Sequence, residues 1–208
     1  GEIPPPLRRG RDDLEKRTVT YRPPIVQQKP IRIKLSYNAD HPTFTSPQPY
    51  YVIDGEGKKL FEVKENASVT LTRVGSEFRL EQGNAIRTSS IIRFNPVVEE
   101  GIMEITSWEH RPSWNASLND NKFRGTIEVR LVGEEVTYIN ELPLEDYLKG
   151  LAEASQDTSL EKMKAIAVLA RTYARFYMQP ENRKFPEFPY DGSDDPDIFQ
   201  KYLGYGFE

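Results

Sequence analysis

The chain contains no cysteine and only two histidines, His41 and His110, among its 208 residues. Without cysteine there is no disulfide, no thiolate metal ligand and no cysteine nucleophile. The two histidines lie far apart in the sequence, which argues against a zinc site and against a Ser-His-Asp triad. We therefore expect neither a metal nor another cofactor.

No charge of one sign dominates, because 28 Lys and Arg residues stand against 32 Asp and Glu residues, a net charge of −4. This balance argues against a broad basic surface, so nucleic acid is not an expected partner. No apolar run is long enough to span a bilayer, and no basic start precedes an apolar segment. We expect contact with a membrane only through an anchor outside this chain. Hydrophobic residues make up 37% of the sequence, enough for a core.

Residues 1–30 contain few large apolar side chains, and prolines alternate there with charged residues. Three arginines, Arg8, Arg9 and Arg11, could contact an anionic surface, but acidic residues follow at once. We expect this segment to be a flexible linker or tail.

From residue 31 to residue 122 the sequence changes to short runs in which apolar and polar residues alternate. This pattern is typical of strands with one buried face. Turns with glycine, at 54–57 and 82–84, separate some of the runs. Seven strands are predicted, at residues 31–35, 50–54, 60–64, 68–74, 77–82, 90–96 and 102–107. We expect a β-rich N-terminal region that forms a sheet or a barrel-like unit.

Two tryptophans, Trp108 and Trp114, fall in the loop-rich segment near the end of this region. An exposed indole can stack on the face of a sugar ring, whereas an indole beside a loop commonly closes a core. The sequence leaves both roles open.

Residues 123–140 form two alternating runs with Gly133 and Glu134 between them, which predicts a β-hairpin. Pro143 suits the first position of a helix, and the acidic residues after it favour the positive end of the helix dipole. Leucine and tyrosine recur at helical spacing. We therefore predict a first helix from Pro143 to about residues 152–154.

A second helix is predicted after a polar break, because Thr158 and Glu161 have the spacing of a capping box. Its alanine-rich apolar face runs to about Met178 and predicts a central, tightly packed helix. Lys164 and Arg171 lie on one side of it, two turns apart. That side is either a solvated charged face or part of a site.

A loop rich in proline and aromatic residues follows the second helix. After this loop, Asp195 suits an N-cap and Pro196 suits the first helical position. We predict a last short helix that Gly204 ends.

Three segments resemble, in the same order, the motifs of the SpoIID/LytB family of bacterial cell-wall proteins. They are LPLEDYLKG at 142–150, KMKAIAVLARTYA at 162–174 and YDGSDDPDIFQKYLGYGFE at 190–208. The resemblance covers residues 123–208 and implies an α+β fold, in which the β-rich N-terminal region is followed by a β-hairpin and a helical catalytic-type segment. It also implies that the C-terminal part of the family domain, where some members hold zinc through Cys and His, is missing here, so the domain is either minimal or continues outside this chain.

The resemblance implies a lytic transglycosylase that cuts peptide-free glycan strands of peptidoglycan, secreted to the cell wall or cell surface of a bacterium. The family uses the Glu of a Glu-Met-Pro motif. Counted back from the second helix, this Glu falls on Glu153; counted forward from the first helix, it falls on Ser155. We choose Glu153, because a shortened break between the helices is easily accommodated. Ala154 and Ser155 then replace Met-Pro, and Ile166 replaces a Gln of the family motif.

Such an enzyme can work with one carboxyl group, because the 6-hydroxyl of the sugar is the nucleophile. The Glu first donates a proton to the leaving oxygen and then accepts one from that hydroxyl. The resemblance implies a substrate-binding role for Arg171, Lys164, Tyr173, Gln200 and Tyr202. An arginine fork suits the lactyl carboxylate that removal of the stem peptide exposes. Alternatively, Arg171 forms an internal salt bridge to Glu145 or Asp191.

Two other functions stay open. A non-catalytic peptidoglycan-binding or amidase-modulating module, with a cell-wall amidase as partner, would bind glycan strands without forming an anhydro-muramic product. A structural β domain of a surface protein would use its helices for packing only. A Glu153 buried in a hydrogen-bonded pair, away from any groove, would favour that last function.

Overall fold

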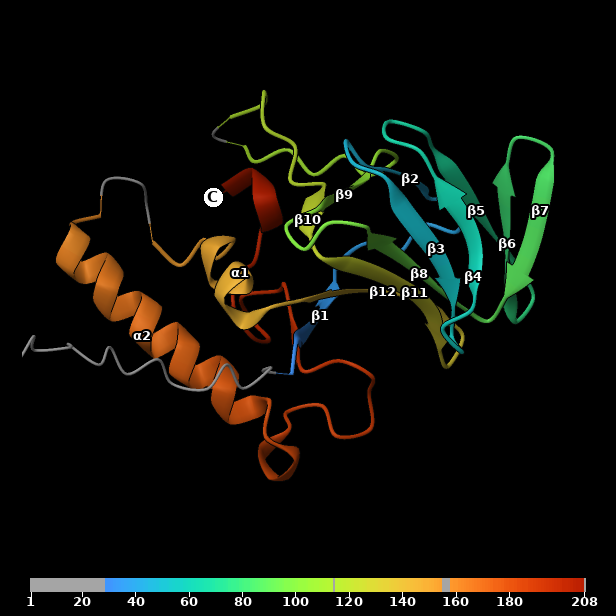
Figure 1. Ribbon diagram of the computed structural model, residues 1–208. Coiled ribbons are helices and arrows are strands. Elements are labelled where there is room, and N and C mark those ends of the chain that lie inside the picture. Colours follow the sequence, from blue (N-terminus) through green and yellow to red (C-terminus); the bar gives the residue numbers. More distant parts are fainter. Residues whose placement is uncertain (1–28, 114, 155–157, 208) are drawn as a thin grey trace, which may run out of the picture.

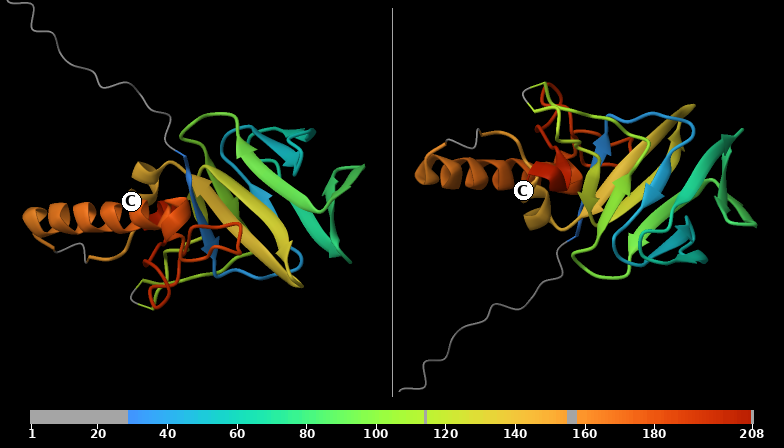
Figure 2. Two further views of the ribbon diagram at one scale, coloured as in Figure 1. Left: turned by 90° about the horizontal axis from the view of Figure 1, so that it is seen from below. Right: turned by 90° about the horizontal axis from the view of Figure 1, so that it is seen from above.

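Two β-sheets lie face to face, and two α-helices stand at one end of them (Figures 1 and 2). The computed structural model describes residues 29–113, 115–154 and 158–207. The predicted tail at 1–30 therefore lies almost entirely outside the described residues, as do Trp114 and Ser155. Within the described residues the fold is a strand-rich mixture of α and β structure, in agreement with the α+β prediction.

The larger sheet has seven strands and is antiparallel except for the pair β1 and β13. Its strands are, in spatial order, β13 (Gly192–Ser193), β1 (Ile31–Leu35), β12 (Glu135–Leu142), β11 (Thr126–Val132), β8 (Ile91–Pro96), β3 (Tyr50–Asp54) and β4 (Lys59–Val63). The smaller sheet has six strands. They are β10 (Lys122–Arg124), β9 (Ile102–Ile105), β2 (Thr43–Thr45), β5 (Val69–Val74), β6 (Glu77–Gln82) and β7 (Ala85–Ser89).

The seven predicted strands are confirmed as β1, β3, β4, β5, β6, β8 and β9, with ends that differ by at most two residues. The predicted hairpin is β11 and β12, and Gly133 in its turn has a φ of +62°. Four strands were not predicted, among them β13, which has only two residues. β2 and β10 have only three residues each, too few to show alternation. β7 is the edge strand of its sheet and has no buried residue.

The main core lies between the two sheets. Phe44 of β2 stacks on Phe94 of β8, with ring centroids 3.8 Å apart. The hydroxyl of Tyr50 is buried with them and donates to the carbonyl oxygens of Phe44 and Ala67, at 3.2 and 3.0 Å. This polar group is thereby satisfied, so it can be buried without a large free-energy cost.

The strands of the hairpin join the two parts of the sequence. β11 pairs with β8, and β12 pairs with β1. Residues before and after position 122 thus share the larger sheet. The division into an N-terminal region at 31–122 and a segment at 123–208 stays a prediction about sequence units.

The first helix, α1 (Leu144–Lys149), is shorter than predicted. Pro143 is its N-cap residue, and its first turn carries the two acidic residues as expected. It ends before residues 152–154 because Gly150 and Ala152 use their backbone groups to pair with residues 201–203. A helix would need those same groups for its own hydrogen bonds.

The second helix, α2 (Leu160–Tyr177), starts one residue later than the predicted capping box requires. Ser159 is its N-cap residue, and no side chain caps the helix there. The carboxylate of Glu161 instead accepts a hydrogen bond from Lys164 at 2.9 Å. The capping-box prediction is therefore wrong.

The prediction that α2 is central and tightly packed is also wrong. Figure 2 shows it projecting from the end of the sheets, and Ala170 and Ala174 are its only fully buried residues. Five of its large apolar side chains are at least 45% exposed: Leu160, Met163, Val168, Leu169 and Phe176. Periodicity identified the apolar face of this helix, but it could not tell whether another element covers that face.

The predicted last helix is a single turn, in which the amides of Ile198 and Phe199 donate to the carbonyl of Asp195 at 3.1 and 2.8 Å. The chain then extends to pair with residues 150–152 and finishes in a short 3₁₀ helix, η2 (Gly204–Phe207). A second 3₁₀ helix, η1 (Pro180–Asn182), follows α2.

Replacing Gly204 tests how closely the C-terminal segment lies against the sheet. Gly204 has a φ of +76°, and a Cβ there would come within 2.5 Å of the carbonyl oxygen of Lys122. We expect Gly204→Ala to lower the free energy of unfolding by more than the ~1–2 kcal/mol that left-handed backbone costs an L-residue.

Gly133→Ala is the matched control, because Gly133 has a φ of +62° with nothing within 4 Å of the added methyl group. Denaturant unfolding of both variants measures the difference. Equal losses of stability would contradict the close approach at Gly204.

Candidate functional site

A short antiparallel contact between residues 150–152 and 201–203 forms the base of the candidate site. Leu151 and Tyr202 form a β-bridge. On either side of it, the amide of Ala152 donates to the carbonyl of Lys201, and the amide of Leu203 donates to that of Gly150, each at 2.9 Å. This pairing fixes the direction in which the chain continues to Glu153.

Glu153 is exposed and follows this contact directly. The backbone amide of Lys201 donates to its Oε1 at 2.7 Å, which holds the carboxylate in place. Its Oε2 has no hydrogen-bond partner among the residues that the structure describes. One oxygen of this carboxylate is therefore fixed, and the other can meet a ligand.

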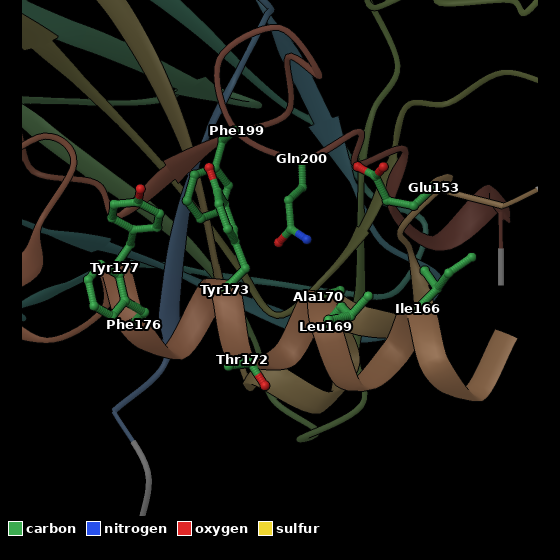
Figure 3. A pocket seen from close by; sticks show the side chains of 10 residues that line it. All are labelled: Glu153, Ile166, Leu169, Ala170, Thr172, Tyr173, Phe176, Tyr177, Phe199 and Gln200. Carbon is green, nitrogen blue, oxygen red and sulfur yellow. The ribbon is translucent and has the colours of Figure 1, made fainter. Parts of the chain in front are cut away.

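A pocket of about 690 Å³ runs along α2, with Glu153 near one end (Figure 3). Phe199 and Gln200 lie across from the helix. The helix contributes the remaining lining residues: Ile166, Leu169, Ala170, Thr172, Tyr173, Phe176 and Tyr177. Most of this lining is apolar or aromatic, so the carboxylate borders a surface that would exclude water when covered.

Three of the four aromatic rings that line the pocket pack against one another. The ring centroid of Tyr173 lies 4.8 Å from that of Tyr177 and 5.1 Å from that of Phe199. Tyr177 and Phe199 lie 5.9 Å apart, edge to face. Lys184 donates to the carbonyl of Ile198, and its Nζ lies 3.4 Å from the hydroxyl of Tyr173. These contacts hold α2 against the turn that carries Phe199.

Gln200 lies in the pocket between α2 and Glu153 (Figure 3). Its Oε1 accepts a hydrogen bond from the hydroxyl of Tyr147 at 3.1 Å. Burial, with smaller contributions from Tyr202 and Glu153, raises the pKa of Tyr147 well above its ordinary value, so this hydroxyl keeps its proton. Because Oε1 is occupied, the amide nitrogen is left to face a ligand, and it has no partner among the described residues.

Arg171 and Lys164 do not line the pocket. Arg171 donates through Nε and Nη2 to the two carboxylate oxygens of Glu145, at 2.9 and 2.6 Å, and this hydrogen bonding lowers the pKa of Glu145. Lys164 pairs with Glu161 on its own helix. Of the two salt bridges suggested for Arg171, the one to Glu145 is present and links α2 to α1.

Tyr202 is buried and does not line the pocket, and its hydroxyl donates to Oδ1 of Asn140 at 2.8 Å. Of the five predicted substrate-binding residues, Tyr173 and Gln200 thus share the pocket with Glu153. Phe199 was missed as a pocket residue, because its spacing within an expected helix indicated a packing position. The adjacent Gln200, which the motif resemblance had already indicated, was the available signal.

Trp108 closes the core and offers no free face for a sugar. It is 9% exposed and stacks between Tyr37 and Phe123, at centroid distances of 5.0 and 5.6 Å. The second tryptophan considered for sugar stacking, Trp114, lies outside the described residues.

Within residues 29–113, 115–154 and 158–207, no three acidic or histidine side chains are grouped so that they could hold a metal ion. In the same ranges no helix has the length and apolar character needed to cross a membrane. The polar side chains that line the pocket are the carboxylate of Glu153, the amide of Gln200 and the hydroxyl groups of Thr172, Tyr173 and Tyr177.

Comparison with known proteins places a family match over this site. Residues 132–207 match the family described as Stage II sporulation protein, SpoIID, which confirms the resemblance read from the three motifs. An uncharacterized protein of Brachyspira hyodysenteriae is 36% identical over 72 residues, which are 34% of this chain and 20% of that relative. The aligned part of the chain thus spans about a fifth of the relative's length. No solved structure matches the chain.

Removal of the Tyr147 hydroxyl tests the anchoring of Gln200. We expect Tyr147→Phe to lower the free energy of unfolding by about 1–3 kcal/mol, because it leaves Oε1 of the buried Gln200 without its donor. Tyr205→Phe is the control, since Tyr205 is 36% exposed. This variant should lower the free energy of unfolding by no more than about 0.5 kcal/mol. Chemical denaturation measures both, and indistinguishable losses would contradict the proposed anchor.

Proposed function

We propose that this chain, whose residues 132–207 match the SpoIID family, acts on the bacterial cell wall as a lytic transglycosylase. The match suggests a role related to the cell wall. The observation that carries the proposal further is the exposed carboxylate of Glu153, with one fixed and one free oxygen, at the end of an aromatic pocket. The substrate would be peptide-free glycan strands of peptidoglycan. The protein would act on them outside the cytoplasm, in the cell wall or at the cell surface.

The lining of the pocket supports a sugar ligand. Pyranose rings present C–H faces that pack well on aromatic side chains. The partly exposed rings of Tyr173 and Tyr177 and the exposed ring of Phe176 offer such faces, with the buried Phe199 packed behind the two tyrosines. The free amide nitrogen of Gln200 can donate to a hydroxyl or to the carbonyl of an acetamido group. The lining residues follow α2 from Ile166 to Tyr177 (Figure 3), and an elongated pocket of this kind suits a long glycan strand.

One carboxyl group is sufficient for the reaction. Glu153 first donates its proton to the bridging oxygen while the bond from that oxygen to the anomeric carbon of the muramic residue breaks. The 6-hydroxyl of the same residue then attacks the anomeric carbon and gives its proton back to Glu153. A 1,6-anhydro ring forms, a sugar with a free 4-hydroxyl leaves, and the enzyme returns to its starting state without consuming water.

The surroundings of Glu153 suit both halves of this cycle. A bound glycan would remove water from around the carboxyl group, and desolvation favours the protonated form that an acid catalyst needs. The amide of Lys201 on Oε1 leaves Oε2 as the atom that exchanges the proton. No second carboxylate lines the described pocket, so a two-carboxylate hydrolysis is not supported.

We assign Arg171 a positioning role. The guanidinium group of Arg171 already donates two hydrogen bonds to the carboxylate of Glu145. While this salt bridge is formed, Arg171 cannot bind a lactyl carboxylate in the same way. By linking α2 to α1, the pair holds the helix that forms one wall of the pocket. Lys164 lies nearer the N-terminal end of α2 than the helix residues that line the pocket, and its side chain is 60% exposed. It could therefore contact a glycan strand only outside the pocket.

A second candidate function is a glycan-binding or amidase-modulating module without catalysis. It is favoured by Ala154, which stands where the family motif has Met, and by the exposure of Glu153 in the free protein. The same aromatic pocket would serve it. A cell-wall amidase would then be the partner. A purely structural role is not supported, because Glu153 is exposed beside a pocket.

Glu153→Gln tests the catalytic assignment. We expect cleavage of peptide-free glycan strands to fall by about 10²–10⁴-fold, because the amide can neither donate nor accept the transferred proton. Mass spectrometry of anhydro-muramic products measures the rate, and an unchanged melting temperature shows that the fold is kept.

Glu187→Gln is the control, since Glu187 is exposed and lies outside the pocket. It should cleave at the wild-type rate. Undiminished cleavage by Glu153→Gln would refute the assignment. Saturable glycan binding by the wild type with no anhydro product would instead select the second candidate function.

Arg171→Ala distinguishes bracing of α2 from recognition of the lactyl group. We expect it to weaken binding of peptide-free glycan and of the same glycan with amidated lactyl groups by the same factor, while stability falls by no more than ~1 kcal/mol, as is usual for an exposed pair. Glu145→Gln should reproduce both effects, because it breaks the same contact. A loss confined to the free carboxylate form, with Glu145→Gln unaffected, would show direct recognition.

A further inference from the structure

We propose that a second cavity, on the outer face of the larger sheet, binds a small oxyanion such as a phosphate or carboxylate group. The cavity has a volume of about 360 Å³ and shares no lining residue with the pocket beside Glu153. Cationic side chains dominate its lining: Lys29, Arg32, Arg93, Arg130 and Arg183. The proposal is independent of the proposed function.

The floor of this cavity is a row of charges across four strands. Strand alternation points Ile31, Ile33 and Leu35 of β1 into the core, so Arg32 between them points to the outer face. Arg32 of β1 lies opposite Glu141 of β12 in the sheet. Arg93 of β8 lies opposite Glu128 of β11.

The ion pairs within this row are close. Arg32 donates to Glu128 at 2.8 Å and also pairs with Glu141. Arg93 reaches Glu128 at 2.7 Å and Glu141 at 2.6 Å. Burial alone raises the pKa of Glu141, but hydrogen bonds and charge from Arg93 and Arg32 outweigh it and hold this pKa below its ordinary value. The Glu141 carboxylate is therefore ionised at neutral pH.

The charges do not balance. The five cationic residues of the cavity are matched by three carboxylates in the cavity and its ion pairs, those of Glu128, Glu141 and Asp191. Two positive charges remain in excess. Glu128 and Asp191 are 3% and 1% exposed, so they lie beneath the cationic side chains and do not shield the opening.

Arg130 and Arg183 carry most of this excess. Arg130 has one long contact to Glu128, at 3.4 Å. Arg183 donates to the neutral carbonyls of Phe188 and Tyr190, and its Nε lies 3.9 Å from Asp191. Among the described residues, three buried side-chain N or O atoms lack a hydrogen-bond partner, and two of them are the Nε atoms of these arginines.

This pattern differs from that of a purely structural ion-pair network. The guanidinium groups of Arg32 and Arg93 are occupied by the carboxylates of Glu128 and Glu141. Arg32 also donates to the carbonyl of Pro189, which holds that part of the chain on the sheet. Arg130 and Arg183 remain 31% and 26% exposed at the cavity with donors to spare. Guanidinium groups placed in this way favour planar or tetrahedral oxyanions, to which they can donate in pairs.

Titration calorimetry with inorganic phosphate, and separately with acetate, tests the site at low ionic strength. We expect saturable binding of at least one anion by the wild-type chain, weakened by added chloride because the contact is electrostatic. Arg130→Gln and Arg183→Gln should each lower the affinity about tenfold or more, as the loss of a charge-assisted hydrogen bond does. The two anions show whether phosphate or carboxylate is preferred.

Arg79→Gln is the matched control, because Arg79 is exposed on β6 of the other sheet and pairs with Glu81 at 3.1 Å. It removes the same charge from the chain at a distance from the cavity. Melting temperatures identify any variant that fails to fold, in which case the other arginine variant decides. The absence of saturable binding of both anions to the wild type, or an equal loss in Arg79→Gln, would overturn the proposal.

Discussion

The candidate site depends on one set of buried hydrogen bonds, which fixes residues 199–204 between the larger sheet and α1. Tyr202 donates to Asn140 at 2.8 Å, and the amide of Asn140 in turn donates to the carbonyls of Arg124 and Thr126, at 2.8 and 3.2 Å. In a buried setting each of these groups would be costly to leave unpaired. The segment therefore cannot slide along the sheet. Because its backbone also donates to Glu153 and its Gln200 is held by Tyr147, the position of the carboxylate follows from the same bonds.

The two walls of the pocket differ in how firmly they are held. The wall formed by Phe199 and Gln200 belongs to the fixed segment, whereas α2 buries little more than Ala170 and Ala174. The helix is held by contacts among aromatic rings, by the exposed pair of Arg171 with Glu145, and by Lys184 near its C-terminal end. Such contacts are individually weak. Under the proposed function, α2 is therefore the wall that would move to fit a bound glycan, while Glu153 would stay in place.

Patterns within short stretches of sequence predicted most of the strands correctly, but they did not predict where the helices end. Alternation identified seven strands because one face of each is buried in the core, and it failed for β7, which has no buried face. Helical spacing continued past Lys149, but long-range pairing of Gly150 and Ala152 stopped α1. For the site, motif resemblance led to Glu153, Tyr173 and Gln200, which the fold brings into one pocket. It could not separate Arg171 from these, because the sequence left both a substrate-binding role and a salt bridge to Glu145 open, and only the fold shows that the salt bridge forms.

A single short strand lies in the chain between residues of the pocket beside Glu153 and residues of the cationic cavity. β13 pairs in parallel with β1, so Gly192 lies beside Ile33 and Ser193 beside Lys34. Asp191, just before β13, belongs to the cationic cavity, and Phe199, shortly after it, belongs to the pocket. The ring of Phe199 lies so close to Gly192 that a Cβ there would come within 2.5 Å of it. Only glycine allows this approach without displacing the ring. The aromatic wall of the pocket thus requires a strand without side chains at that point, and the register that fixes this strand also sets the edge of the cationic cavity.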